Sequence, residues 1–179
     1  FPDMKDKISH NLSPMAEIAR YMKKHEPNCK IVFIGPCTAK KAECKKETVS
    51  PYIDNVITFE ELQALFDAKE VKLESLESEP LDNASYYGRI FARSGGLSDA
   101  VANALKEMDI PDDVFKLKAA VCDGIDNCRT ALLKAQKGVG GENFIEGMAC
   151  IDGCIGGAAC LTHGPKAVSY THLTLPTIC

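Results

Sequence analysis

The sequence lacks several features that mark whole classes of protein. No apolar run reaches the roughly 18 residues that a membrane-spanning helix needs. The first residues show no signal-peptide pattern of a basic start, an apolar middle and a small-residue cleavage site. An excess of basic charge is also absent, because the formal net charge is −4 and the isoelectric point is about 5.6. We therefore expect a cytoplasmic protein with no membrane and no nucleic acid among its partners.

Both ends of the sequence also lack an expected feature. Residue 1 is not Met, and "FPDMKDKISHNL" is typical of a helix already under way. The last thirteen residues, "AVSYTHLTLPTIC", contain no Lys, Arg, Asp or Glu, and they resemble the translated read-through of a sequencing adapter. We expect native sequence over residues 1–166, a non-native tail over 167–179, and hence a fragment of a longer protein.

Cysteine, by contrast, is abundant, with nine in 179 residues. Without a secretory signal, these thiols indicate metal or redox chemistry rather than a disulfide framework. Three of them lie in "NFIEGMACIDGCIGGAACLTHGPK" (143–166), which is crowded with glycine and alanine. Such a segment is either a tight loop with inert thiols or a backbone wrapped closely around an inorganic cluster.

Short apolar runs alternate with helical periodicity along the chain. Ser13 followed by Pro14 predicts the start of a helix over 13–26, and Thr58 predicts the N-cap of a second helix, with Glu60 and Glu61 in its first turn. Strands are expected at 29–35, just before Thr58, at 115–124 and at 143–150, and further helices at 94–108 and 125–138.

This alternation predicts an α/β fold with a largely parallel sheet flanked by helices. The charged segment 70–88 is interpreted as a surface excursion rather than a domain linker. Parallel sheets place their sites beyond the carboxyl ends of strands, and two such loops carry cysteine: "GPCTAKKAEC" (35–44) and "MACIDGC" (148–154). We expect these distant cysteines to meet and to share one metal centre.

Two of these segments carry a family resemblance. "GPCTAKKAE" and "FIEGMACIDGCIGG" resemble the second and third signature motifs of the iron-only (FeFe) hydrogenases, within the catalytic domain of that enzyme's large chain. "GRIFARSGGLSDAV" resembles the segment between them, and the resemblance covers residues 1–166. It implies part of that family's two-lobed catalytic domain. The family's first motif, Thr/Ser-Cys-Cys-Pro, is expected upstream of Phe1, so the fragment alone is expected to be inactive.

The resemblance also implies a cofactor, the H-cluster. This is a 4Fe–4S cubane bridged by a cysteine sulfur to a two-iron unit that bears CO, cyanide and a dithiolate. Cys37, Cys150 and Cys154 match three of the family's ligands, and Cys154 matches the bridging sulfur. Thiolates are the soft ligands that iron–sulfur clusters select. The implied partners are H2 and protons, ferredoxin or another electron carrier, and hydrogenase maturation proteins.

Further roles follow from the same resemblance. Lys40 matches a lysine that pairs with a cyanide, and Glu43 matches a carboxylate of the proton path, where burial would suit a relay near neutral pH. Ser9 aligns with a serine on that path, and Met148 with a methionine packed against the two-iron unit. The thiols expected to be inert in the core are Cys29, Cys44, Cys122, Cys128 and Cys160, and His163 is expected to be a packed or surface residue.

Two positions depart from the best-known catalytic members of the family. Gly35 stands where those members have a methionine, and Asp152 stands where they have a glycine; both changes would alter the polarity and redox potential of the pocket. Reversible oxidation of H2 and reduction of protons is the first interpretation. One alternative is a homologue that senses H2 or redox state and turns over slowly. A second is a non-catalytic protein with a structural zinc site made by Cys37, Cys44, Cys150 and Cys154.

Overall fold

The computed structural model describes residues 1–79 and 84–161. The predicted tail (167–179) and His163 lie outside these described residues. The chain divides into two compact units: unit 1 includes residues 1–8 and 84–157, and unit 2 includes residues 9–79 and 158–161. No helix in the described part of the chain is long and apolar enough to cross a membrane.

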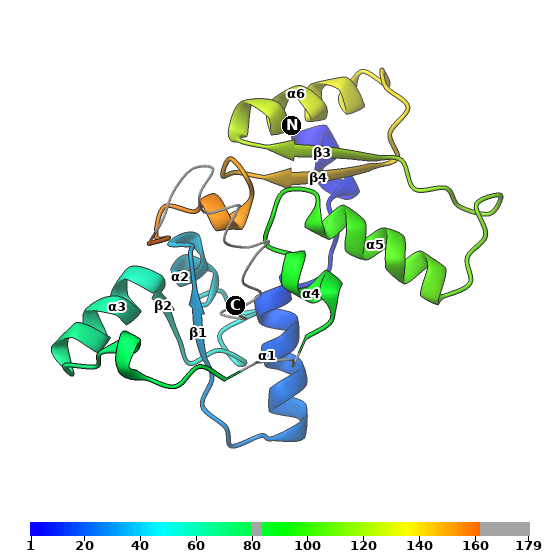
Figure 1. Cartoon of the computed structure of the whole chain (residues 1–179). Helices are drawn as coiled ribbons and strands as arrows, with labels where there is room; N and C mark the ends of the chain where they lie inside the picture. The colour runs from blue at the N-terminus through cyan, green and yellow to red at the C-terminus, as the bar shows by residue number, and fades with distance from the viewer. Residues whose placement is uncertain (80–83, 162–179) are drawn as a thin grey trace. The chain divides into compact units, whose positions relative to one another are not determined.

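Unit 2 is built from two strand–helix pairs and a preceding helix. Strand β1 (Val32–Gly35) pairs in parallel with β2 (Asn55–Thr58), and each leads into a helix. The helices of this unit are α1 (Pro14–His25), α2 (Ala39–Glu43) and α3 (Phe59–Ala68), labelled in Figure 1. As the sequence predicted, α1 begins after Ser13, whose hydroxyl accepts a hydrogen bond from the backbone N–H of Ala16 at 3.4 Å.

The core of unit 2 lies between α1 and the strands. The apolar face of α1 packs against Val56 of β2 and against residues that precede the two strands. This buried cluster consists of Met15, Ala16, Ala19, Ile31, Val49, Ile53 and Val56. Cys29 and Cys44 adjoin the cluster, as expected of core thiols. The strand predicted at 29–35 is shorter than expected, since β1 covers only Val32–Gly35. It is also less buried than expected: it pairs with one described strand, and Val32 is 50% exposed.

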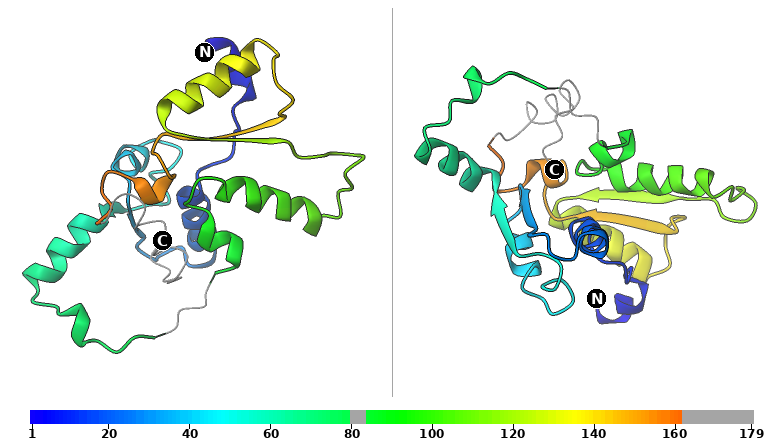
Figure 2. Two further views of the ribbon diagram at one scale, coloured as in Figure 1. Left: turned by 45° about the horizontal axis from the view of Figure 1, so that its top comes forward. Right: turned by 90° about the horizontal axis from the view of Figure 1, so that it is seen from below.

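Unit 1 contains a second parallel pair, β3 (Ala119–Asp123) and β4 (Phe144–Met148). Helix α6 (Ile125–Gln136) connects the two strands, and α5 (Gly96–Glu107) lies on the opposite side of the pair from α6 in Figures 1 and 2. The short α4 (Tyr86–Ile90) precedes α5, and 3-10 helices occupy Pro2–Lys7 and Cys154–Gly156.

The predicted α/β fold with parallel strands flanked by helices is confirmed. The described strands are divided between two two-stranded parallel sheets, one in each unit. Cys37 therefore follows a strand of one sheet and Cys150 a strand of the other, so convergence at a single sheet edge does not apply to them. Residues 70–79 are all exposed, as expected of a surface excursion, and the division between the two units falls after Glu79.

The start of α3 has the strongest local determinant in unit 2. The Thr58 hydroxyl accepts from the backbone N–H of Glu61 at 3.2 Å, and the Glu61 carboxylate accepts from the backbone N–H of Thr58 at 2.8 Å. This reciprocal capping box satisfies two backbone donors at the strand-to-helix junction. Thr58 is buried, so water cannot replace its hydroxyl easily.

Replacing this cap should weaken unit 2. We expect Thr58→Ala to lower the free energy of unfolding by about 1–2 kcal/mol, because a buried helix donor loses its acceptor. Thr48→Ala is the matched control, since Thr48 is exposed, and it should change the free energy by less than about 0.5 kcal/mol. Urea unfolding followed by circular dichroism measures both, and equal values for the two variants would contradict the role of the cap.

Candidate metal centre

The loop that carries Cys150 and Cys154 leaves the end of β4. In the strand register, Met148 lies opposite Asp123, the last residue of β3. The Asp123 carboxylate accepts from the backbone N–H of Asp152 at 2.8 Å, and the N–H of Gly153 donates to the carbonyl of Cys150 at 3.2 Å. The two cysteines are thus connected by a closed turn that is anchored to the neighbouring strand.

A second anchor of this loop is the segment before α5. The N–H of Ser94 donates to the carbonyl of Asp152 at 3.1 Å, the N–H of Ile155 donates to the carbonyl of Ala92 at 3.3 Å, and Arg93 forms an antiparallel bridge with Gly153. Gly153 has φ of +83°, and a Cβ there would lie 2.6 Å from the Ser94 nitrogen. Only glycine allows the two backbones to approach so closely.

Asp152 also has a left-handed backbone, with φ of +66°. Aspartate tolerates this region better than most residues, but glycine adopts it without strain. The expected departure from glycine at this position therefore carries a local backbone cost.

Strand β4 is tied to α5 by Glu146, which is 1% exposed. Its carboxylate accepts from the backbone N–H of Gly95 at 2.9 Å, and from the N–H and hydroxyl of Ser98 at 2.8 and 2.6 Å. Sequence reasoning missed this residue, although an acidic side chain within the otherwise apolar "FIEGM" strand was a visible signal.

Arg93 contributes a donor beside the cysteine loop. Its Nη2 pairs with the Asp99 carboxylate at 3.0 Å, whereas its Nε is buried and has no hydrogen-bond partner among the described residues. A buried guanidinium N–H without an acceptor favours an anionic group nearby.

Cys37 belongs to unit 2 and lies half-buried between β1 and α2. Helix α2 carries Lys40 and Glu43, whose side chains are 21% and 20% exposed. The Lys40 Nζ donates to the Glu43 carboxylate at 2.6 Å, and the Ser13 hydroxyl also hydrogen-bonds to Glu43. This cluster joins the first turn of α1 to α2.

The expected proton affinity of Glu43 was wrong. Partial burial raises the pKa of the Glu43 carboxyl, but the hydrogen bonds from Lys40 and Ser13 and the Lys40 charge outweigh this effect and lower the pKa below its usual value. Sequence reasoning anticipated the burial of Glu43 but assigned Lys40 to a cyanide, and it did not consider that Lys40 would pair with Glu43 on the same helix.

The other predicted site residues have simpler surroundings. Ser9 is exposed, and its hydroxyl accepts from the backbone N–H of Asn11 at 3.3 Å; the serine bonded to Glu43 is Ser13. Met148 is half-buried, and its carbonyl accepts from the Cys128 thiol at 3.4 Å. The proposed roles of Ser9 and Met148 stay predictions.

Gly35 is buried at the end of β1, next to the ring of Phe33. A Cβ on Gly35 would lie 2.6 Å from that ring. The Phe33 ring therefore occupies part of the space that a larger side chain at position 35 would need, and a methionine there would require Phe33 to move.

The donor atoms suit an iron–sulfur group, although no complete ligand set is assembled. Within residues 1–79 and 84–161, no group of three or more His, Cys, Asp or Glu side chains could hold a metal ion. Cys37 lies in unit 2, and Cys150 and Cys154 lie in unit 1. Soft thiols, a glycine-dependent turn and the Arg93 donor fit an anionic sulfur-ligated cluster.

The zinc alternative receives less support. Its fourth proposed ligand, Cys44, donates its S–H to the carbonyl of Lys41 at 3.2 Å and adjoins the core of unit 2. A thiol engaged in this way behaves as a small core residue.

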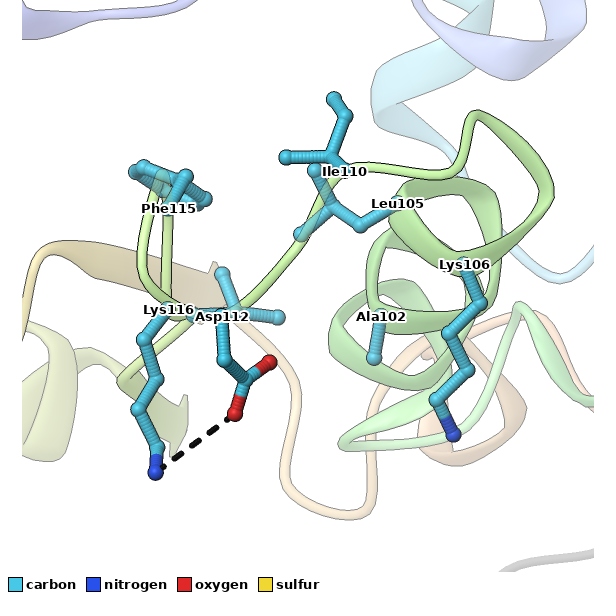
Figure 3. Close-up of a pocket in the computed structure, with 8 residues that line it drawn as sticks. Ala102, Leu105, Lys106, Ile110, Asp112, Phe115 and Lys116 are labelled. Atoms are coloured by element: carbon cyan, nitrogen blue, oxygen red, sulfur yellow. Dashed lines mark ion pairs between the residues drawn. The ribbon is translucent and has the colours of Figure 1, made fainter.

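A separate cavity of about 170 Å³ lies between α5 and the 110–117 segment. Figure 3 shows Leu105, Ile110 and Phe115 on its apolar side and the Asp112–Lys116 ion pair, at 3.6 Å, at its edge. None of the candidate ligands lines it, so it plays no part in the metal centre.

Comparison with known proteins identifies a family. The model described as "Iron only hydrogenase large subunit, C-terminal domain" matches residues 1–158. The chain is 32% identical to the NADP-reducing hydrogenase subunit HndD of Solidesulfovibrio fructosivorans, over 88% of this chain and 33% of that protein. It is 27% identical to iron hydrogenase 1 of Clostridium pasteurianum, over 93% of this chain and 36% of that protein.

A second group of relatives has a different name. A probable cytosolic Fe–S cluster assembly factor of Aedes aegypti is 26% identical over 72% of this chain and 35% of that protein. The chain thus spans about a third of the length of these curated relatives.

Solved structures agree on the fold. A variant of FeFe-hydrogenase HydA1 from Chlamydomonas reinhardtii superimposes with a TM-score of 0.72 at 22% identity, over 97% of this chain and 61% of that one. The described part of the chain therefore has the α/β fold of an FeFe-hydrogenase catalytic domain.

The Lys40–Glu43 pair gives a measurable prediction. In Lys40→Met, we expect the pKa of Glu43 to rise, because partial burial remains while the strongest donor and its charge are lost. In the parent, the lowered pKa means that Glu43 contributes stability above its unfolded pKa, and this contribution is lost as the pH falls through the folded pKa. We expect this contribution to be smaller in Lys40→Met. Carboxyl-carbon NMR titration measures the shift in the pKa.

Lys41→Met is the control, because Lys41 pairs with Glu61 instead. An unchanged pKa of Glu43 in Lys40→Met would contradict the assignment.

Proposed function

Because the chain belongs to the iron-only hydrogenase family, in which it matches the C-terminal domain of the large subunit, we propose that the complete protein oxidises H2 and reduces protons reversibly at an H-cluster. The observation that carries this proposal is the Cys150–Cys154 loop, whose closed turn and glycine-dependent approach to Ser94 lie inside the matched region. So many backbone contacts around two cysteines favour the interpretation that these cysteines hold a bulky sulfur-ligated group, over the interpretation that they are inert core residues.

The residues that would hold the cluster are Cys37, Cys150 and Cys154, with Cys154 as the sulfur shared by the cubane and the two-iron unit. When bound, the cluster supplies electron storage and the iron at which H2 is made or split. The chain supplies thiolates, a fixed loop and the buried Arg93 Nε donor. Backbone and side-chain donors near cluster sulfurs are the usual means of tuning its potential.

Lys40 and Glu43 would act together in this proposal. An ammonium has three donor hydrogens, so Lys40 can keep its bond to Glu43 and still donate to an anionic ligand such as cyanide. Glu43 would hold Lys40 in place and carry a proton at its carboxylate, with Ser9 on the same route. The lowered pKa of Glu43 means that it would accept this proton only transiently at neutral pH. Met148 would contribute a polarizable thioether beside the two-iron unit.

The partners in this proposal are those that the chemistry requires. Electrons would come from or go to ferredoxin or another carrier, and maturation proteins would supply the two-iron unit. A cytoplasmic location is part of the same proposal, and relatives named as cytosolic Fe–S cluster assembly factors support it.

Those relatives also favour a second candidate function. A protein of Drosophila grimshawi with the same kind of name is 28% identical over 72% of this chain. In this alternative the chain holds an iron–sulfur cluster for assembly work, without a two-iron unit that carries CO and cyanide.

Infrared spectroscopy of the complete parent protein separates the two functions. After anaerobic maturation, we expect bands of bound CO and cyanide, and we expect Cys154→Ala to lose them because the covalent tie between the two parts of the cluster is removed. Cys44→Ala is the matched control and should keep the bands, since Cys44 is a core thiol.

Two outcomes would contradict the first proposal. Undiminished bands in Cys154→Ala would remove Cys154 from the site. A parent protein that contains iron and acid-labile sulfide but shows no such bands would favour the assembly function.

A further inference from the structure

We propose that Glu146 is a positioning residue that fixes the geometry of the Cys150–Cys154 loop. It does so by holding both the strand that enters the loop and the segment against which the loop rests. The importance of this loop rests on the proposed function, whereas the contacts of Glu146 do not depend on it.

The environment of Glu146 is unusual for a carboxylate. It lies in the middle of β4 and is 1% exposed, with Val121 as its partner in the strand register. A carboxylate in such a place is destabilising unless hydrogen bonds replace the water that it has lost. Three donors do so, and all of them come from Gly95 and Ser98 at the start of α5. The two N–H groups among them are backbone donors that the first turn of a helix leaves unpaired.

One side chain therefore fixes two pieces of backbone. On one side, Glu146 stands four residues before Cys150 on the strand that leads into the loop. On the other side, it holds Gly95, and the neighbouring residues Ala92 to Ser94 make the backbone contacts with Asp152, Gly153 and Ile155. If Glu146 released Gly95, the surface that receives the cysteine loop would be free to shift relative to β4.

Glu146→Gln is the primary test. Glutamine keeps the size and one acceptor oxygen, but its NH2 group faces a donor where the second carboxylate oxygen was. Glu142→Gln is the matched control, because Glu142 is an exposed glutamate just before the same strand. Ser98→Ala is the second variant: it removes only the 2.6 Å hydroxyl contact and tests the same clamp if Glu146→Gln does not fold.

The first readout is the alkylation rate of each thiol in the metal-free chain, measured with iodoacetamide and mass spectrometry. We expect Cys150 to react roughly tenfold faster in Glu146→Gln and less than that in Ser98→Ala, because the loop opens more easily. Cys128 in the same unit and Cys29 in unit 2 should keep their parental rates, as should every thiol in Glu142→Gln.

The second readout is the electron paramagnetic resonance spectrum of the complete parent protein after reconstitution with ferrous iron and sulfide. At equal iron content, we expect shifted g-values for the reduced cubane in Glu146→Gln and parental values in Glu142→Gln. A parental Cys150 rate in Glu146→Gln, or an equal rise at Cys128, would overturn the proposal, because the latter means general loosening of unit 1.

The two proposals fail in distinguishable ways. If the complete protein shows no bands of CO and cyanide, the hydrogenase function is wrong, yet a selective rise at Cys150 still establishes Glu146 as the residue that positions the loop. If the bands are present and Cys150 keeps its parental rate in Glu146→Gln, the function stands and the positioning role is wrong.

Discussion

Unit 1 depends on the need of one buried carboxylate for hydrogen-bond donors. Glu146 sits in an otherwise apolar strand, and its two oxygens accept hydrogen bonds from the start of α5. The hydrogen bond from the Gly95 N–H holds Gly95 against β4, and it thereby positions the residues on either side of Gly95. Ser94 meets the cysteine loop, and α5 covers the side of the strand pair opposite α6 (Figure 1).

Unit 2 uses a carboxylate in the same way at its surface. Asp54 accepts from the Lys30 ammonium at 2.9 Å and from the backbone N–H of Ile31 at 2.8 Å, which joins the residues before β1 to those before β2. The Lys30 and Ile31 hydrogen bonds hold the pKa of Asp54 well below its usual range. In each unit an acidic side chain therefore links a strand, or the residue just before one, to backbone that is distant in the sequence.

This arrangement explains why the family can be identified more easily than the activity. The cysteine loops, the Gly153 turn and Glu146 concern how thiols are held, which any protein with a cluster of this kind needs. Two positions near the candidate ligands have local constraints of their own: Phe33 fills the space beside Gly35, and Asp152 takes a left-handed backbone conformation that glycine adopts without strain. Some curated relatives are named as hydrogenases and others as cluster assembly factors, so the shared family does not by itself decide one activity.

The sequence by itself determined the local structure. Ser13-Pro14 and Thr58 with Glu61 predicted helix starts correctly, since a cap is made by residues three positions apart, and the alternation of strands and helices predicted parallel pairing. Only the tertiary structure decided that the strands form two sheets, that Glu146 receives its donors from a segment 48 to 51 residues earlier, and that Lys40 and Ser13 keep the Glu43 pKa low. Propensity and capping act within a few residues, whereas burial and the pKa of a carboxylate depend on whichever distant groups the fold brings to it.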